Sequence, residues 1–405
     1  MAGVSIDHMV SLVILIAAAI LFVGLFNSTL STAVSYQRNA STAKKCSDLI
    51  DDILLTPGIP INGTPTTFGL QDPLFSQYQV SPFSLMRLNY TIGSPVSYQK
   101  TGLTYSNITA SAYNYLLYPY TDMINYSYVQ QLLGINGSYG FQLTFNPTIK
   151  IAIAQVSTAP LNLSLTVSGT GFPLANATVN YILIPVLLNS SYPDFETIVT
   201  NQTGTFQTNA IGQATATFPT FSPNTNSNLT YAFVAYAHLD GVAGIGCYEQ
   251  AATGSKKIIP FLTTLSAQDV TLAHSDDVPT TSGFSNTLFY NSTFILANQN
   301  YLLQQTSLAT SQPFGNVTSG SGNPYISLSM GSYTPGILAV AYNYAGNTGI
   351  TMVPWGFGLG FSMTFGGNPA NQGWVATDMR QVQIYGLSYQ ATLSLWNTQG
   401  YQVTG

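Results

Sequence analysis

Charged side chains are scarce in this chain. They make up 6% of its 405 residues, whereas about 25% is usual in soluble proteins. Nine Lys and Arg against fourteen Asp and Glu give a net charge of −5, so the chain offers no basic face and we exclude nucleic acid as a partner. Ser, Thr, Asn, Gln, Tyr and Gly supply the polarity instead. Aromatic residues at 12%, together with many β-branched residues, favour strands.

Cysteine and histidine are also rare, and this limits catalysis and metal binding. Cys46 and Cys247 have no metal-ligand spacing; we expect two separate buried thiols, with an extracellular disulfide as the alternative. His238 and Asp240 share one face of a predicted strand, and residues 274–277 form a polar loop that would suit a cation. Without a nucleophile motif, zinc spacing or phosphate loop, both are better explained as structural. The sequence predicts a non-enzyme with no cofactor and no metal.

Long apolar runs are absent except for one. The segment from Met9 to Phe26 carries no charge and is about 27 Å long as a helix, close to the ~30 Å hydrocarbon thickness of a bilayer. Neither Pro nor Gly follows until Pro57 and Gly58, so we predict one continuous helix over 1–56. The side chains expected to form its core or anchor are Met9, Leu12, Val13, Ile14, Leu15, Ile16, Ile20, Leu21, Phe22, Leu25 and Phe26.

The second half of this helix is amphipathic. Apolar residues recur there at three- and four-residue steps, and a third of the basic residues of the chain fall between Arg38 and Lys45. Asp48, Asp51 and Asp52 follow within helical pairing distance of these cations. We interpret the charged segment as a solvated collar above a membrane, or as a contact between neighbouring subunits.

Acceptor sequences for N-linked glycans are frequent. Fourteen Asn-X-Ser/Thr triplets are present, although chance would give about six if a fifth of the residues are Ser or Thr. We therefore predict glycosylation and an extracellular location; incidental triplets on a Thr- and Asn-rich β surface are the alternative. The expected sites beyond the helix are Asn62, Asn89, Asn107, Asn125, Asn136, Asn162, Asn176, Asn189, Asn201, Asn228, Asn291 and Asn316.

The chain after the helix is predicted to be mainly β. We expect a small mixed β domain over 57–150, a β-sandwich over 151–260 and a C-terminal β domain over 261–405. The clearest strand is 161–167, where apolar and polar residues alternate strictly. The fold class is thus one long N-terminal α-helix followed by tandem β-sandwich, immunoglobulin-like domains. A Gly- and aromatic-rich stretch over 355–361 is either a binding ridge or a close-packed strand.

Two parts of the chain resemble known families. Residues 171–179 and 208–215 resemble strand-turn signatures of bacterial and archaeal immunoglobulin-like surface domains. The N-terminal helix, apolar and then amphipathic, is similar to that of archaeal type IV pilins and archaellins. Uncharacterised archaeal surface proteins that begin with such a helix are similar to this chain over residues 35–58, 68–70, 82–88 and 387–396. The resemblance implies that Asp7 pairs with the free amino terminus of a neighbouring subunit. Pilin precursors carry a basic leader, whereas residues 1–8 contain neither Lys nor Arg.

The sequence therefore predicts an archaeal cell-surface structural protein. Its helix would bundle with copies of itself to form a filament core, and its glycosylated β domains would face outward. The alternative is a single-pass, membrane-anchored ectodomain, an adhesin or envelope component that does not polymerise.

Overall fold

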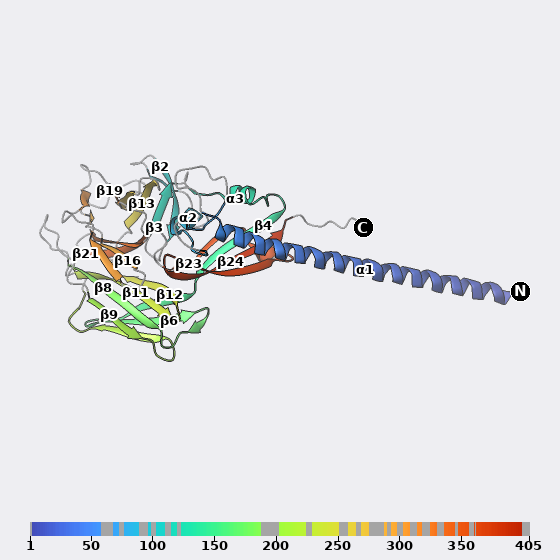
Figure 1. Cartoon of the computed structure of the whole chain (residues 1–405), viewed down its shortest axis with the longest axis horizontal. Coiled ribbons are helices and arrows are strands. Elements are labelled where there is room, and N and C mark those ends of the chain that lie inside the picture. Colours follow the sequence, from blue (N-terminus) through green and yellow to red (C-terminus); the bar gives the residue numbers. More distant parts are fainter. Residues whose placement is uncertain are drawn as a thin grey trace.

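The chain folds into one long helix and a β-rich head (Figure 1). The structure, a computed structural model, describes residues 2–57, 68–72, 77–88, 96–98, 103–109, 115–119, 123–187, 202–223, 229–250, 258–264, 269–274, 287–289, 293–297, 303–307, 314–317, 325–329, 336–344, 347–355, 360 and 362–398. The predicted fold class is confirmed, because nearly all described strand pairs in the head are antiparallel and follow a single long helix.

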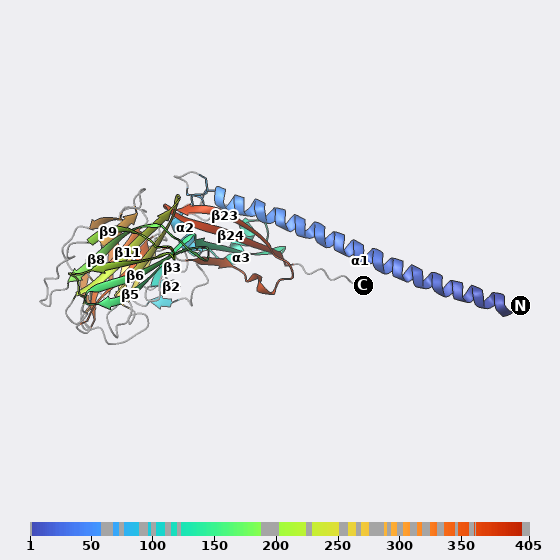
Figure 2. The same ribbon diagram turned by 90° about the horizontal axis from the view of Figure 1, so that it is seen from below.

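The helix α1 (Ala2–Leu55) is continuous, as the absence of Pro and Gly after residue 26 predicts. It extends away from the head for most of its length, and only its C-terminal part lies against strands (Figures 1 and 2). Beyond its end, Leu70 N donates to Ile53 O at 2.8 Å and Gln71 N donates to Thr56 O at 3.0 Å. These bonds satisfy carbonyl groups that a helix terminus otherwise leaves without partners.

A four-stranded antiparallel sheet supports this end of α1. Its order is β22 (Met363–Gly366), β4 (Tyr139–Pro147), β24 (Leu387–Asn397) and β23 (Ala376–Ile384). Buried side chains alternate with half-buried ones along β4, and β23 has exposed side chains at every second position, so one face of the sheet packs inward and the other is more accessible to water. The short helices α2 (Pro82–Arg87) and α3 (Tyr126–Leu132), with the 3-10 turn η4 (Pro369–Asn371), complete this part of the head.

Residues 149–249 form a β-sandwich. One sheet has the order β10 (Gln213–Phe218), β6 (Leu161–Gly169), β5 (Ile149–Thr158), with β7 (Phe172–Pro173) beside β6. The other has the order β12 (Val242–Glu249), β11 (Leu229–Leu239), β8 (Thr178–Leu187), β9 (Gln202–Gln207). Both sheets contribute to one buried cluster that includes Leu163, Tyr231 and Phe233. This strand order is that of an immunoglobulin-like sandwich.

Two further sheets make up the remainder of the head. The first has the order β1 (Val96–Tyr98), β2 (Leu103–Thr109), β3 (Tyr115–Pro119), β13 (Ile258–Thr264), β14 (Asp269–His274), β19 (Tyr325–Ser329). The second has the order β17 (Leu303–Ser307), β16 (Thr293–Ala297), β20 (Gly336–Tyr344), β15 (Thr287–Phe289), β18 (Phe314–Val317), and β21 (Asn347–Trp355) pairs with β20.

Described sheets join segments that the predicted domain boundaries divide. Strand β4 lies in the predicted domain 57–150, yet it pairs with β22 and β24 of the predicted domain 261–405. Strand β3 likewise pairs with β13 across both boundaries. Segments 57–150 and 261–405 are therefore not separate in the described sheets. Pairing between distant strands depends on complementary faces, and a local residue pattern does not carry that information.

Two tight turns show why particular residues stand between strands. Asp240 and Gly241 join β11 to β12 with φ of 50° and 81°, and Tyr385 and Gly386 join β23 to β24 with φ of 48° and 81°. Positive φ at both central positions is typical of the type I′ turn, whose twist matches that of the flanking strands. Asp240 therefore has a structural role next to His238, as the sequence favours.

Glycine allows the two sheets of the sandwich to approach closely at one edge. A Cβ atom at Gly244 of β12 would overlap the carbonyl oxygen of Ile149 in β5. We predict that Gly244→Ala destabilises the head by about 1–3 kcal/mol, because neither backbone can move without disturbing its strand. Chemical denaturation measures this loss. The control is Gly373→Ala, since no heavy atom lies within 4 Å of a Cβ there; equal midpoints for the two variants would contradict the close packing.

Candidate functional site: the exposed apolar helix and its attachment to the head

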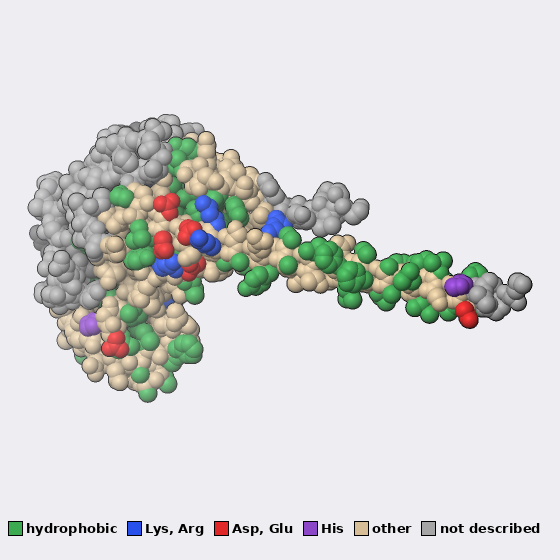
Figure 3. Space-filling model, turned by 45° about the vertical axis from the view of Figure 1, so that its right-hand side comes forward, with side chains coloured by type: hydrophobic (Ala, Val, Ile, Leu, Met, Phe, Trp, Pro, Cys, Tyr) green, Lys and Arg blue, Asp and Glu red, His purple; other side chains and the backbone are tan. Residues whose placement is uncertain are grey.

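The apolar segment of α1 is exposed on every side. All eleven side chains predicted to form its core or anchor are between 50% and 69% exposed. Residues 12–16 are consecutive and apolar, and because successive helical residues are about 100° apart, they cover the whole circumference. The space-filling view shows this apolar surface well away from the head (Figure 3). A helix that is hydrophobic all round is normally buried in protein or in a membrane.

The length and composition of α1 are sufficient for it to cross a membrane. The stretch without Asp, Glu, Lys or Arg is longer than the apolar segment, because it extends from residue 8 to residue 37. At about 1.5 Å per residue this stretch is about 45 Å long, which exceeds the ~30 Å hydrocarbon core. Its last part also keeps exposed apolar side chains, such as Leu30 and Val34.

Two hydroxyl groups in the C-terminal half of this stretch form hydrogen bonds within the helix. Thr29 Oγ1 donates to Leu25 O, and Thr32 Oγ1 donates to Ser28 O, each at 2.8 Å. The free-energy cost of removing a hydroxyl group from water is smaller when it is hydrogen-bonded to the i−4 carbonyl. The segment therefore tolerates burial although it contains Ser and Thr.

The C-terminal part of α1 attaches to the head through an apolar stripe. Cys46, Leu49, Ile50, Ile53 and Leu54 are all less than 5% exposed and lie against β23 and β24. Their spacing of three and four residues places them on one side of the helix. This attachment joins the first element of the chain to its last two strands.

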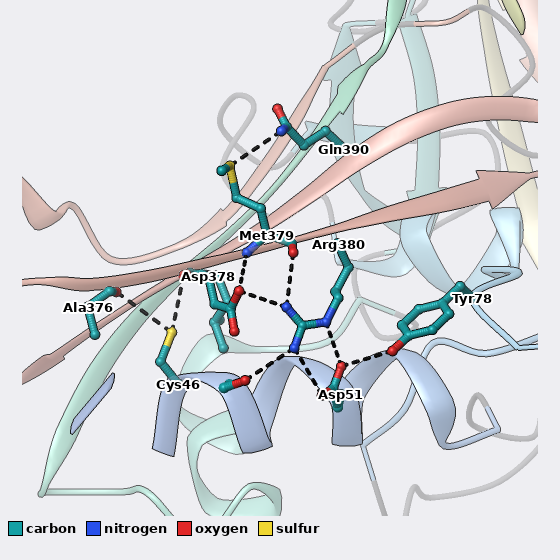
Figure 4. Close-up of polar contacts among 10 residues, drawn as sticks. Cys46, Asp51, Tyr78, Ala376, Asp378, Met379, Arg380 and Gln390 are labelled. Atoms are coloured by element: carbon teal, nitrogen blue, oxygen red, sulfur yellow. Dashed lines mark hydrogen bonds and ion pairs between the residues drawn. The ribbon is translucent and has the colours of Figure 1, made fainter. Parts of the chain in front are cut away.

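Arg380 of β23 holds the helix from the side (Figure 4). Its Nε donates to Asp51 Oδ1 at 2.8 Å and its Nη2 donates to Asp51 Oδ2 at 3.0 Å, a bidentate ion pair. The same Nη2 also donates to Ser47 Oγ at 3.2 Å, and Tyr78 OH donates to Asp51 Oδ1 at 3.2 Å. A planar guanidinium that bonds both oxygens of a carboxylate fixes orientation as well as distance.

The same cluster covers the outer edge of β23 at Met379; farther along, Gln383 on this edge is bonded to Tyr78 and Val80. Asp378 Oδ1 accepts from Met379 N at 2.7 Å, and Arg380 Nη1 donates to Met379 O at 3.0 Å and to Asp378 Oδ1 at 2.7 Å. The backbone groups of Met379 are thus bonded by side chains of the adjacent residues. Charged side chains on an edge strand discourage pairing with another chain.

Electrostatics in this cluster favour the charged forms. The hydrogen bond to Asp51 raises the pKa of Arg380, and this exceeds the opposing effect of partial burial. Partial burial alone would raise the pKa of Asp378, but hydrogen bonds with Ser47 and Arg380 outweigh it. The pKa of Asp378 is therefore lower than its ordinary value of 3.8.

Cys46, on the side of α1 that faces β23 and β24, is a free thiol, and Cys247 is free as well. The two thiols are therefore separate, as expected, but only Cys46 is buried and Cys247 is half-buried. Cys46 Sγ donates to Leu393 O at 3.3 Å and to Ala376 O at 3.7 Å. Burial, with the nearby carboxylate of Asp378, raises the pKa of Cys46 to about 11. Because only the thiolate reacts quickly, Cys46 is unreactive while the helix is attached.

The other predicted site residues are dispersed. Asp7 is exposed near the N-terminal end of α1, the end that projects away from the head (Figure 1). Among the predicted glycan sites, Asn136 and Asn176 are exposed in turns, whereas Asn162 is half-buried in β6 and its Nδ2 donates to Ser157 Oγ. Asn125 caps α3, and the backbones of Asn107 and Asn316 lie in β2 and β18. Outside the described residues lie Asn62, Asn89, Asn189, Asn201, Asn228 and Asn291.

The candidate chemical sites of the sequence do not form a centre in the structure. His238 lies near the end of β11 and Asp240 in the following turn, while 275–277 are outside the described residues. Within the ranges that the structure describes, no three His, Cys, Asp or Glu side chains are grouped for metal binding. Gly360 of the aromatic stretch packs against Ile245, while residues 356–359 and 361 lie outside the described residues.

Comparison with known proteins gives no family. No family model and no curated protein matches the chain. Among solved structures, trypsin-activated alpha-2-macroglobulin from Escherichia coli aligns with a TM-score of 0.22 at 12% identity, over 58% of this chain and 18% of that chain. Red sea bream transglutaminase aligns with a TM-score of 0.18 at 12% identity, over 62% of this chain and 37% of that one. This chain thus spans a minor part of those proteins, and similarity this low carries no information on function.

We predict that Arg380→Ala loosens the attachment of α1 by about 1–2 kcal/mol. The substitution leaves two carboxylates together without their shared cation, and the partial exposure of Asp51 keeps the loss below that of a buried pair. The rate of maleimide labelling at Cys46, mapped by mass spectrometry, should rise about tenfold. The control is Lys150→Ala, which removes an exposed charge from β5; a similar rate in both variants would contradict the role of Arg380.

We also predict that acid weakens the attachment only below about pH 4. The pKa of Asp378 in the folded protein is below 3.8, so its contribution to stability is complete above the ordinary pKa and is lost as pH falls through the lower, folded value. Hydrogen-exchange protection of α1 peptides over 46–55, corrected for intrinsic rates, measures the change. Asp378→Asn should have a flatter pH dependence, and a decline beginning near pH 6 would disagree with this account.

Proposed function

We propose that this protein is a structural subunit of an archaeal cell surface, which polymerises through α1 into a pilin-like filament and displays its β domains outward. One observation carries the proposal: an apolar helix segment, exposed on all sides, continues into a part of α1 that is bonded to a folded head. In water such a helix loses the free energy of burying its side chains, about 25 cal/mol per Å² of apolar surface. It therefore needs either lipid or other copies of itself.

Two features favour a filament over a membrane anchor. The uncharged stretch continues past the thickness of a bilayer, and Leu30 and Val34 keep apolar surface there that lipid tails would not reach. Packing against the helices of other copies would cover that surface. In such a bundle the exposed Asp7 would need a cation, and the amino terminus of a neighbouring subunit supplies one.

A single-pass anchored ectodomain is the second candidate. The length of the segment Met9–Phe26 favours it, because about 27 Å matches the hydrocarbon core of a bilayer. Under both candidates the head lies outside the cell, where glycans at exposed triplets such as Asn136 and Asn176 would face water. A chain with few titratable side chains is also suited to a surface that experiences changes in pH.

Electron microscopy of material sheared from cells tests the proposal. We predict filaments that contain this chain, and their loss in Ile16→Asp, because an ionised carboxylate in the helix core is not compensated. The control is Ile211→Asp, which places the same change in an exposed turn of the head. Filaments that persist in Ile16→Asp would contradict assembly through α1. A chain that stays in detergent-extracted membranes and is absent from sheared filaments would favour the anchor.

A further inference from the structure

The long segment between β4 and β22 begins and ends at neighbouring points of one sheet. Phe145 of β4 is paired with Met363 of β22, and Thr144 with Thr364, in antiparallel register. Neighbouring strands lie about 4.8 Å apart, so a short turn would be enough to join these two ends. Residues 148–362 thus occupy the place of a hairpin loop.

A second segment has the same property. Ile124 N donates to Arg87 O at 3.0 Å, so the segment between Leu88 and Met123 also begins and ends at neighbouring points. Both Leu88 and Met123 are buried. The two segments contact each other, because β3, between Leu88 and Met123, is paired with β13, between β4 and β22, through Leu117 and Phe261.

The sandwich has a buried cluster of its own, and Tyr236 of β11 also interacts with Tyr385 and Tyr389 on the other side of the junctions. The buried cluster of the sandwich contains only residues between Ile149 and Ala237. A different set of buried residues surrounds the end of α1 and the sheet β22-β4-β24-β23, including Ile53, Phe141 and Leu393. The contacts between these parts include β12 against β24 and two hydrogen bonds to Ser388: Thr148 N donates to Ser388 O, and Ala243 N donates to Ser388 Oγ.

We infer that the chain consists of an assembly unit and an inserted module. The assembly unit comprises the described residues within 2–88, 123–147 and 363–398, and the inserted module comprises those within 89–122 and 148–362. This inference rests on the proposed function and assigns the contact with other copies of the chain to the assembly unit alone. The inserted module lies at the end of the head opposite the projecting helix in both ribbon views, where it is free to serve a separate, outward-facing role (Figures 1 and 2).

Matched substitutions in the full-length chain test the inference. Phe141 in the assembly unit and Phe233 in the sandwich are both fully buried. Phe141→Ala should open the attachment of α1, raise the labelling rate at Cys46 about a hundredfold and abolish filaments. Phe233→Ala should destabilise the sandwich, seen as increased hydrogen exchange in β6 and β11, but leave Cys46 protected and filaments present.

The outcomes separate this inference from the proposed function. If Phe233→Ala exposes Cys46 as much as Phe141→Ala does, the head is one cooperative unit and the inference is wrong. Filaments that disappear in Phe233→Ala while Cys46 stays protected would assign assembly to the inserted module and overturn it equally. If the unaltered chain forms no filaments, the proposed function fails, and the labelling pattern still decides whether two units exist.

Discussion

The exposed apolar surface of α1 is the constraint from which the rest of this molecule is best understood. Each large apolar side chain gains about 1.5–3 kcal/mol when it is transferred out of water, and eleven such side chains are exposed in one segment. That driving force exceeds the contribution of any single contact in the head. The helix itself therefore determines that its apolar segment lies in an apolar environment. The head needs only to remain attached to the helix and to stay folded beside that environment.

Attachment depends on two kinds of contact that act on different aspects of the same junction. The buried stripe from Cys46 to Leu54 supplies the burial of apolar area, which is strong but permits small rotations and shifts. The bidentate bonds from Arg380 to Asp51 supply direction, because a planar guanidinium accepts only a narrow range of carboxylate positions. Arg380 and Asp378 also bond the open backbone groups of Met379, so the residues that orient the helix protect the sheet edge as well.

Much of this architecture was predictable from local sequence patterns. The helix ends at Leu55 beside Pro57 and Gly58, and the strand predicted over 161–167 is β6. The collar was interpreted as solvated or as a subunit contact, whereas Asp51 faces Arg380, 329 residues away. A lone Arg in an alternating strand gives no sign of its partner; its rarity in a chain with nine cations was the one available signal. The pairing of β4 with β22 was equally hidden, because register between distant strands has no local signature.

The order of synthesis has a consequence for this topology. The helix α1 is made first, but the strands that receive it, β23 and β24, are the last elements of the described chain. Until residues 376–397 have been synthesised, neither the apolar stripe from Cys46 to Leu54 nor the carboxylate of Asp51 has its partner. Contacts between such distant segments form late, since the entropy of closing the intervening chain must be overcome first. Under the proposed function, a membrane that holds the segment Met9–Phe26 during this interval would keep the apolar surface from aggregating, whether the finished protein stays in lipid or moves into a filament.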